Sequence, residues 1–353
     1  MTKPQDADPT ARRKDAHLDL CLRPEVEPEG ARTLLDEVHL IHNALPELAE
    51  PELDLSARFL GKPLRAPLLI LGMTGGTPRG GELNRALAAI AERLGVAFGL
   101  GSQRAMLERP SARDTYSVRE VAPTVPVLGN IGIAQAIALG PGRVRDLMES
   151  IGADGLALHL NAAQEMAQPE GDRDFRGALE AIARLADVLG PKLVVKETGC
   201  GISPATCARL VERGVSCVDL SGAGGTSWVS VEILRGGRPG AQPFATWGIP
   251  TAAAVLGARR RVGGAPTLIA SGGIRDGLQA AKALALGADL VGVALPALRA
   301  HEDGGSEGAQ ASLMAIVDGL RMALLLTGCR TPAQLRDVPR VMGPDLARWL
   351  EVL

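Results

Sequence analysis

The residues best suited to chemistry end an apolar segment, LALHLNAAQE at 156–165. His159 interrupts the segment, and Asn161, Gln164 and Glu165 come shortly after it. In an extended strand His159 and Asn161 point to the same side, because one residue separates them. One carboxylate beside amides is a poor zinc site, but it suits Mg²⁺, which keeps waters and takes further oxygens from a phosphate. The alternative is that His159 and Asn161 only cap a helix and satisfy backbone groups.

Lys196 is a second unusual position, because it stands inside the apolar segment LVVKE. Burying a lysine is costly unless it meets an anion or changes its pKa, and the chain has only six lysines. Asn130 and Ser102 could hydrogen-bond the polar edge of a flat ring, and the segment MTGG at 73–76 would let the backbone approach that ring closely. The pattern favours a ligand over a surface lysine whose charge reaches solvent.

The segment SGGIR at 271–275 predicts a phosphate site. Gly272 and Gly273 leave backbone N–H groups uncovered where a helix can begin, and Arg275 adds a positive charge. Tight turns also use glycine for steric reasons alone. Together with the donors for a flat ring, however, this turn outlines a site for flavin mononucleotide (FMN).

A basic segment, ARRKDAH at 11–17, lies far from these residues in the sequence. Arg13, Lys14 and His17 could belong to a lid that closes over an anionic substrate, and Gln103 and Arg104 would add to the same clamp. The alternative is a solvated tail, which is the usual state of a charged terminus.

Eight short apolar segments must position these residues, and amphipathic helices alternate with them from residue 66 onward. Near-continuous apolar segments of this kind predict parallel strands buried on both faces. Eight such units favour a TIM (β/α)8 barrel over a doubly wound open sheet, which usually has fewer strands. The expected strands are 67–72, 96–101, 125–130, 155–160, 192–197, 216–221, 266–271 and 289–295.

The candidate residues stand at the carboxyl ends of these strands, where barrel sites form. All eight ends are polar, small or glycine-rich, and SGGIR follows the seventh strand, where barrels commonly bind phosphate. We therefore expect the candidate residues to converge on one pocket.

The remaining segments complete the expected α/β architecture. Residues 1–65 form an N-terminal extension, irregular or helical, and residues 66–353 form the barrel with long loops at its C-terminal face and C-terminal helices. Two loops are expected, a glycine-rich one at 222–250 and a flexible, exposed one at 301–310. Helices are predicted over 82–95, 175–190, 203–214, 277–287 and 311–328.

Composition narrows the class of protein. The 38 basic and 40 acidic residues nearly cancel, so nothing predicts a nucleic-acid partner. The five cysteines have no CxxC spacing, so neither a zinc ribbon nor a dithiol motif is predicted, and their odd number and scatter are typical of a reducing compartment. The N-terminus has no apolar signal region, and no apolar run approaches a membrane span. We expect a cytoplasmic protein that does not interact with membranes.

Taken together, the motifs resemble those of type 2 isopentenyl-diphosphate isomerase, the flavin-dependent form. The resemblance runs from RRKDAH to about residue 328, almost the whole chain. It implies a TIM barrel that interconverts isopentenyl and dimethylallyl diphosphate with reduced FMN, Mg²⁺ and NADPH, and a homo-oligomer, a tetramer or octamer. The motifs that carry it are RKDAH, MTGGT, GSQR, GNIG, HLNAAQE, VKETGCGIS, DLSGAGGTSW, WGIPT, ASGGIRDG and ALP.

The resemblance also assigns roles to residues. It places Mg²⁺ at Glu165, and it makes Gln164 and His159 the candidate catalytic residues. The FMN contacts that it implies are Met73, Thr74, Gly75, Ser102, Asn130, Lys196, Ser221, Thr226, Gly272, Gly273, Ile274, Arg275, Ala294 and Leu295. The substrate contacts that it implies are Arg13, Lys14, His17, Ser102, Gln103, Arg104, His159, Asn161 and Gln164.

Three other functions remain possible on the same barrel. An FMN-dependent hydroxyacid oxidase or dehydrogenase needs a base at the seventh strand end, where this chain has Ser271 and Gly272. An enzyme of the inosinate-dehydrogenase type needs a cysteine after the sixth strand, where GAGGTSW has none, although Cys200 follows the fifth. A non-catalytic flavin-binding module would need neither RKDAH nor Glu165.

Overall fold

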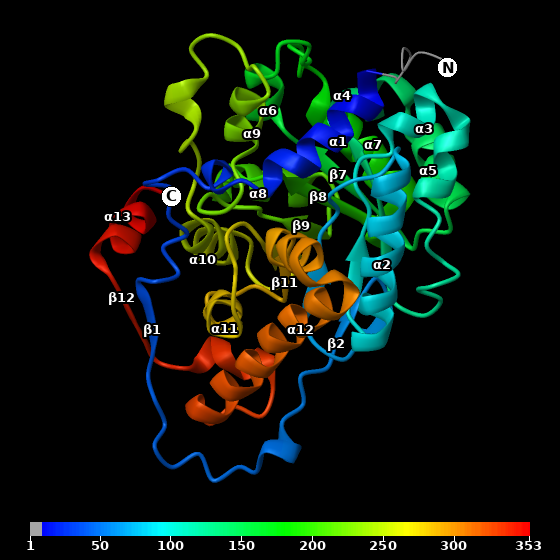
Figure 1. Ribbon diagram of the computed structural model, residues 1–353. Coiled ribbons are helices and arrows are strands. Elements are labelled where there is room, and N and C mark those ends of the chain that lie inside the picture. The colour runs from blue at the N-terminus through cyan, green and yellow to red at the C-terminus, as the bar shows by residue number, and fades with distance from the viewer. Residues whose placement is uncertain (1–8) are drawn as a thin grey trace.

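The computed structural model describes residues 9–353 and contains a closed barrel of eight parallel strands (Figure 1). Each strand pairs with its neighbours in the order β10–β11–β4–β5–β6–β7–β8–β9. The predicted TIM barrel is therefore confirmed, and each expected strand overlaps one observed strand. The barrel strands are β4 (Leu68–Ile70), β5 (Ala97–Gly99), β6 (Val127–Gly132), β7 (Gly155–Leu160), β8 (Leu193–Glu197), β9 (Cys217–Asp219), β10 (Thr267–Ala270) and β11 (Leu290–Val293).

One apolar layer of side chains fills the barrel near the N-terminal ends of its strands. Because side chains alternate along each strand, the members of this layer point inward and their neighbours in sequence point outward. A hairpin of β2 (Ala57–Phe59) and β3 (Lys62–Leu64) adds Phe59 and Leu64 to the same cluster and so closes the N-terminal end. The inward-facing members from the barrel strands include Leu69, Ala97, Leu128, Val194, Cys217, Ile269 and Leu290.

Helices cover the outside of the barrel. Their ends follow ordinary capping chemistry: Ser203 accepts a hydrogen bond from the backbone of Thr206 at the start of α8, and Gly95 adopts a left-handed conformation after α2. The helices that follow barrel strands are α2 (Pro78–Leu94), α3 (Arg104–Glu108), α4 (Ile133–Leu139), α5 (Pro141–Ser150), α6 (Ala162–Ala167), α7 (Ala178–Leu189), α8 (Pro204–Glu212), α9 (Trp228–Leu234), α10 (Thr251–Val262), α11 (Gly277–Ala285) and α12 (Leu295–Thr327). Short 3₁₀ turns lie at 24–26, 50–52, 110–115, 190–192, 242–244 and 332–337.

Two expectations for loops were wrong. The segment 222–250 contains helix α9, which begins after Ser227 because that hydroxyl accepts a hydrogen bond from the backbone of Ser230. The segment 301–310 is part of α12, broken only where Gly304 and Gly305 leave helical geometry. Its polar, glycine-rich composition indicated a loop, but the flanking helical residues continue through it.

The N-terminal extension crosses to the C-terminal face of the barrel. Helix α1 (Pro9–Cys21) lies over the strand ends, and β1 (Val38–Leu40) pairs with β12 (Arg340–Met342) beside α13 (Pro344–Val352) (Figure 1). The first eight residues lie outside the described residues. They are part of the predicted N-terminal extension and of the N-terminal segment in which no signal sequence is predicted.

Helix α12 is long and apolar enough to cross a membrane by length and composition, although the sequence suggested no such segment. In the fold it packs against α11 and α2, and its glycine break divides it into two parts. Among residues 9–353, no other helix meets the same criterion.

Candidate active site

A cavity opens at the C-terminal ends of the strands and extends beneath α1. It collects residues from both ends of the chain, because the last strand of the barrel closes against the first. Twenty of the predicted site residues line it: Arg13, Lys14, His17, Met73, Ser102, Arg104, Asn130, His159, Asn161, Gln164, Glu165, Lys196, Ser221, Thr226, Gly272, Gly273, Ile274, Arg275, Ala294 and Leu295.

The floor of the cavity is the second inward-facing layer of the barrel. Asn130 and Lys196 stand two residues beyond Leu128 and Val194, which belong to the apolar layer below, so their side chains also point inward. Because every second residue of a strand points into the barrel, these polar side chains lie directly above the apolar layer.

His159 is held as a neutral imidazole. Its Nδ1 lies 2.8 Å from Asn130 Oδ1, and an amide oxygen can only accept, so Nδ1 carries the proton. Burial lowers the pKa of His159 to about 3, and the positive charges of Lys196 and Lys14 act in the same direction. The ring therefore offers Nε2 as an acceptor at neutral pH.

Lys196 is held at the end of β8 by a tightly bonded turn. Its Nζ donates to the carbonyl of Glu197, and the Glu197 carboxylate accepts backbone N–H groups from residues 198–201. That carboxylate fills an anion nest of the kind that elsewhere binds phosphate. The turn is thus satisfied internally, and it leaves the Lys196 ammonium beside the cavity.

The turn after β10 has the geometry of a phosphate cradle. Gly272 and Gly273 have φ of +94° and +78°, and a Cβ atom at Gly272 would lie 2.0 Å from the carbonyl oxygen of Gly222. Only glycine fits there. Arg275, predicted to support an anion, forms an ion pair with Glu27, which also binds Arg299.

Helix α1 brings three basic side chains to the cavity, Arg13, Lys14 and His17, although burial lowers the pKa of His17. Lys14 is buried, and its Nζ donates to the carbonyl of Ser102 at 3.3 Å. Burial, with the positive charges of Arg13 and Arg104, lowers the pKa of Lys14 to about 8. An anion bound here would relieve that repulsion, as expected for a lid over a charged substrate.

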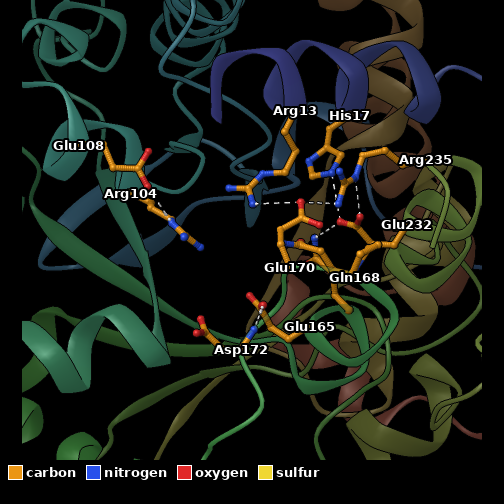
Figure 2. Close-up of polar contacts among 12 residues, drawn as sticks. Arg13, His17, Arg104, Glu108, Glu165, Gln168, Glu170, Asp172, Glu232 and Arg235 are labelled. Atoms are coloured by element: carbon orange, nitrogen blue, oxygen red, sulfur yellow. Dashed lines mark hydrogen bonds and ion pairs between the residues drawn. The ribbon is translucent and has the colours of Figure 1, made fainter. Parts of the chain in front are cut away.

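Glu232, from α9, connects helix α1 to the barrel (Figure 2). Its fully buried carboxylate lies 3.1 Å from His17 Nε2 and accepts hydrogen bonds from Gln164 Nε2 at 3.1 Å and Arg235 Nε at 2.8 Å. Burial opposes its ionisation, but these three partners outweigh burial and lower the pKa of Glu232. Arg13 lies 3.8 Å from Glu170 in the same network.

Glu165 supplies one carboxylate to the cavity wall. It accepts a hydrogen bond from Asn161 Nδ2 at 3.0 Å and from the backbone N–H of Asp172 at 2.8 Å, which fixes its orientation. Within residues 9–353, no three His, Cys, Asp or Glu side chains gather as a metal site. The donors fit a cation that brings waters and shares phosphate oxygens, and they do not fit a structural zinc.

Three predicted site residues lie outside the lining of this cavity. Gln103 is fully buried: its amide donates to Leu147 O at 3.1 Å and accepts from Asn130 N at 2.9 Å, so it braces β6 and is not part of an anion clamp. Thr74 is also buried, and Gly75 packs against Tyr116. Thr74 and Gly75 directly follow Met73, which does line the cavity, so their position in the sequence could not show which of the three reach it.

Two residues at the site were not predicted from the sequence. Glu232 and Trp228 lie in the segment that was expected to be a loop, and the Trp228 ring packs edge-on against His17 with centroids 5.2 Å apart. The sequence did contain a signal for this helix: Ser227 is a typical N-cap residue, and Trp228 and Glu232 follow it one helical turn apart.

The thiol at Cys200 is poorly suited to nucleophilic chemistry. Burial raises its pKa to about 12, and the nearby charge of Glu197 acts in the same direction. A reactive cysteine requires the opposite shift. The geometry therefore disfavours the cysteine-dependent alternative.

Comparison with known proteins gives a consistent result. A sequence profile described as FMN-dependent dehydrogenase matches residues 131–339, more than half of the chain. Curated relatives named isopentenyl-diphosphate delta-isomerase match nearly all of it. The Pyrococcus furiosus protein is 42% identical over 97% of this chain and 89% of its own, and the Methanosarcina barkeri protein is 43% identical over 94% and 92%.

Solved structures share the fold at low identity. A Pediococcus acidilactici lactate oxidase aligns with a TM-score of 0.68 at 16% identity, covering 97% of this chain and 96% of the other. A mandelate oxidase aligns with a TM-score of 0.65 at 18% identity, covering 95% and 100%. At this identity the likeness concerns the barrel alone.

Proposed function

The chain belongs to the isopentenyl-diphosphate delta-isomerase family of enzymes, and from this premise we propose that it interconverts isopentenyl and dimethylallyl diphosphate using FMN, Mg²⁺ and NADPH. The observation that carries the proposal is the convergence of the polar strand ends and the cationic face of α1 on one cavity. A non-catalytic flavin-binding module would not need the cationic face of α1.

The residues of the floor fit FMN. The Gly272–Gly273 turn suits a phosphate, and Ser102, Asn130 and Lys196 suit the polar edge of the ring. Ser221 supports this, because its φ of +41° is strained for a residue with a side chain, and such strain concentrates at functional sites. When bound, reduced FMN supplies the acid–base chemistry at its N5/C4a edge, and NADPH serves to keep it reduced.

The diphosphate belongs beneath α1. Arg13, Lys14 and Arg104 provide positive charge, and the neutral His159 and the amide of Asn161 provide further polar contacts. Glu165 would hold Mg²⁺ together with diphosphate oxygens. Binding of the diphosphate would draw helix α1 toward the barrel, because the negative charge of the diphosphate attracts the positive charges of Arg13 and Lys14.

The shift of the double bond requires a proton to be added at one carbon and removed at another. Protonation of an alkene builds positive charge on carbon, so the cavity must exclude water. Leu18, Trp228 and Leu298 line the cavity with apolar surface. Gln164 faces this space and is fixed by its hydrogen bond to Glu232, which makes it the side chain best placed to orient a proton transfer.

The test is isomerisation of isopentenyl diphosphate by the purified protein with FMN, Mg²⁺ and NADPH, omitting each in turn. We expect activity only with all three, or with dithionite replacing NADPH. Activity without flavin would contradict the proposal. Reduction of bound FMN by lactate or mandelate would instead support the hydroxyacid oxidase or dehydrogenase.

A further inference from the structure

Three polar side chains stand together in the inward-facing layer at the level of the cavity floor. Lys196 on β8 pairs in register with Asp219 on β9, and Ser271 follows β10 beside them. Each lies two residues beyond a member of the apolar layer, Val194, Cys217 or Ile269, so all three point inward. Lys196 reaches the cavity, whereas the other two lie beneath its lining.

Asp219 is the unusual member of this group. Its carboxylate is 1% exposed, and Oδ1 accepts hydrogen bonds from Ser271 Oγ at 2.5 Å and Ser221 N at 3.3 Å. Among the described residues, no hydrogen-bond donor reaches Oδ2. The nearest cation is Lys196, whose Nζ is 3.9 Å from Oδ2, within range of an ion pair but too far for a hydrogen bond.

A carboxylate in this position is expensive. Burial raises the pKa of Asp219, and the positive charge of Lys196 opposes that shift. An apolar residue would fill the barrel at lower cost, as Cys217 and Ile269 do one layer below. The roles assigned so far to FMN, diphosphate and Mg²⁺ do not use this carboxylate. The cation that lies nearest to it among residues 9–353, Lys196, is the residue assigned to the flavin ring.

We propose that Asp219 is the buried countercharge of Lys196, so that the ring of FMN rests over a neutral ion pair and not over an isolated cation. This inference rests on the FMN site of the proposed function. An isolated cation at the floor would favour the extra electron density of reduced FMN over oxidised FMN. Asp219 weakens that preference and is a positioning residue, because it acts through Lys196.

The test is a double-mutant cycle on the FMN-loaded protein, with the midpoint potential and the affinities for oxidised and reduced FMN as readouts. Asp219→Asn keeps the shape and removes the charge. We expect it to raise the affinity for reduced relative to oxidised FMN about tenfold, which for a two-electron couple is a rise of ~30 mV. In the Lys196→Met background the same substitution should leave the potential unchanged.

Asp289→Asn is the matched control. Asp289 precedes β11 at the opposite end of the barrel, where it pairs with Arg259 and Arg336, so its loss should not change the potential. An unchanged or lowered potential in Asp219→Asn would overturn the inference. So would an equal shift in the Lys196→Met background, because Asp219 would then act independently of Lys196.

Folding gives a second readout. Should Asp219→Asn alone not fold, removing both charges in Lys196→Met/Asp219→Asn should restore a folded protein, and failure to do so would count against the ion pair. A wild-type protein that does not retain FMN would refute the proposed function itself. FMN retention with no effect of Asp219 would refute only this inference.

Discussion

The imidazole of His159 and the side-chain amide of Asn130 are joined by a hydrogen bond of 2.8 Å between Nδ1 and Oδ1. This contact links two adjacent strands, β6 and β7, at the cavity floor. It fixes the tautomer, and burial, together with the positive charges of the two nearby lysines, keeps the ring uncharged. A neutral ring can accept a hydrogen bond from substrate while the lysines and arginines carry the positive charge.

His159 should make stability depend on pH. Its pKa is lowered from 6.5 to about 3, so between these values the unfolded chain binds a proton that the folded protein does not. Stability is therefore lost as the pH falls through this window, by about 1 kcal/mol between pH 6 and 5. His159→Gln should remove that part of the slope in urea unfolding measured at each pH. His42→Gln, at an exposed position, should keep the wild-type slope; an equal slope for His159→Gln would show that the ring titrates normally.

Glu232→Gln should uncouple the lid from the barrel. The carboxylate lies against His17 and accepts hydrogen bonds from Gln164 and Arg235, and charged hydrogen bonds of this kind contribute about 1.5–3 kcal/mol each. We expect kcat/KM to fall roughly 10- to 100-fold while FMN remains bound. Glu170→Gln removes a half-exposed partner of the same Arg235 and should change kcat/KM little. Similar losses in both variants would argue against a special role for Glu232.

Glu165→Gln should weaken the Mg²⁺-dependent binding of substrate. The amide retains one oxygen for the Asn161 or Asp172 contact but loses the negative charge that would hold the cation. The Mg²⁺ concentration for half-maximal activity should rise about tenfold or more, with FMN content unchanged by absorbance. Asp174→Asn, at an exposed position, serves as the charge-matched control. Loss of FMN in Glu165→Gln would place the metal site elsewhere.

Gly272→Ala should disrupt the phosphate turn. Its φ of +94° is unfavourable for alanine, and the new Cβ would lie 2.0 Å from a backbone oxygen. Unfolding free energy should fall by about 2–4 kcal/mol, and FMN should be lost on gel filtration. Gly142→Ala, in helix α5 with open space around the added atom, should be neutral or slightly stabilising. Retention of FMN by a stable Gly272→Ala protein would exclude this turn as the cradle.

The barrel, and the position of most candidate site residues at one cavity, could be predicted from the sequence because the signals are local. The alternation of side chains in strands, glycine at helix ends and polar residues at strand ends are all properties of short segments. Closure of the barrel then brings the carboxyl ends of the eight strands together. That is why the sequence predicts that Lys196, Asn130 and Gly272 face one cavity, which they line in the structure.

Tertiary structure alone decided which groups were bonded to one another. Gln103 stands beside Ser102 in sequence, yet packing turns its amide toward the backbone of β6. Glu232 lies against His17 of α1, and Asp219 lies beside Lys196 on the adjacent strand, because the fold brings charges from different elements within a few ångströms. The free energy of a buried charge depends on its partners in space, and sequence order does not specify them.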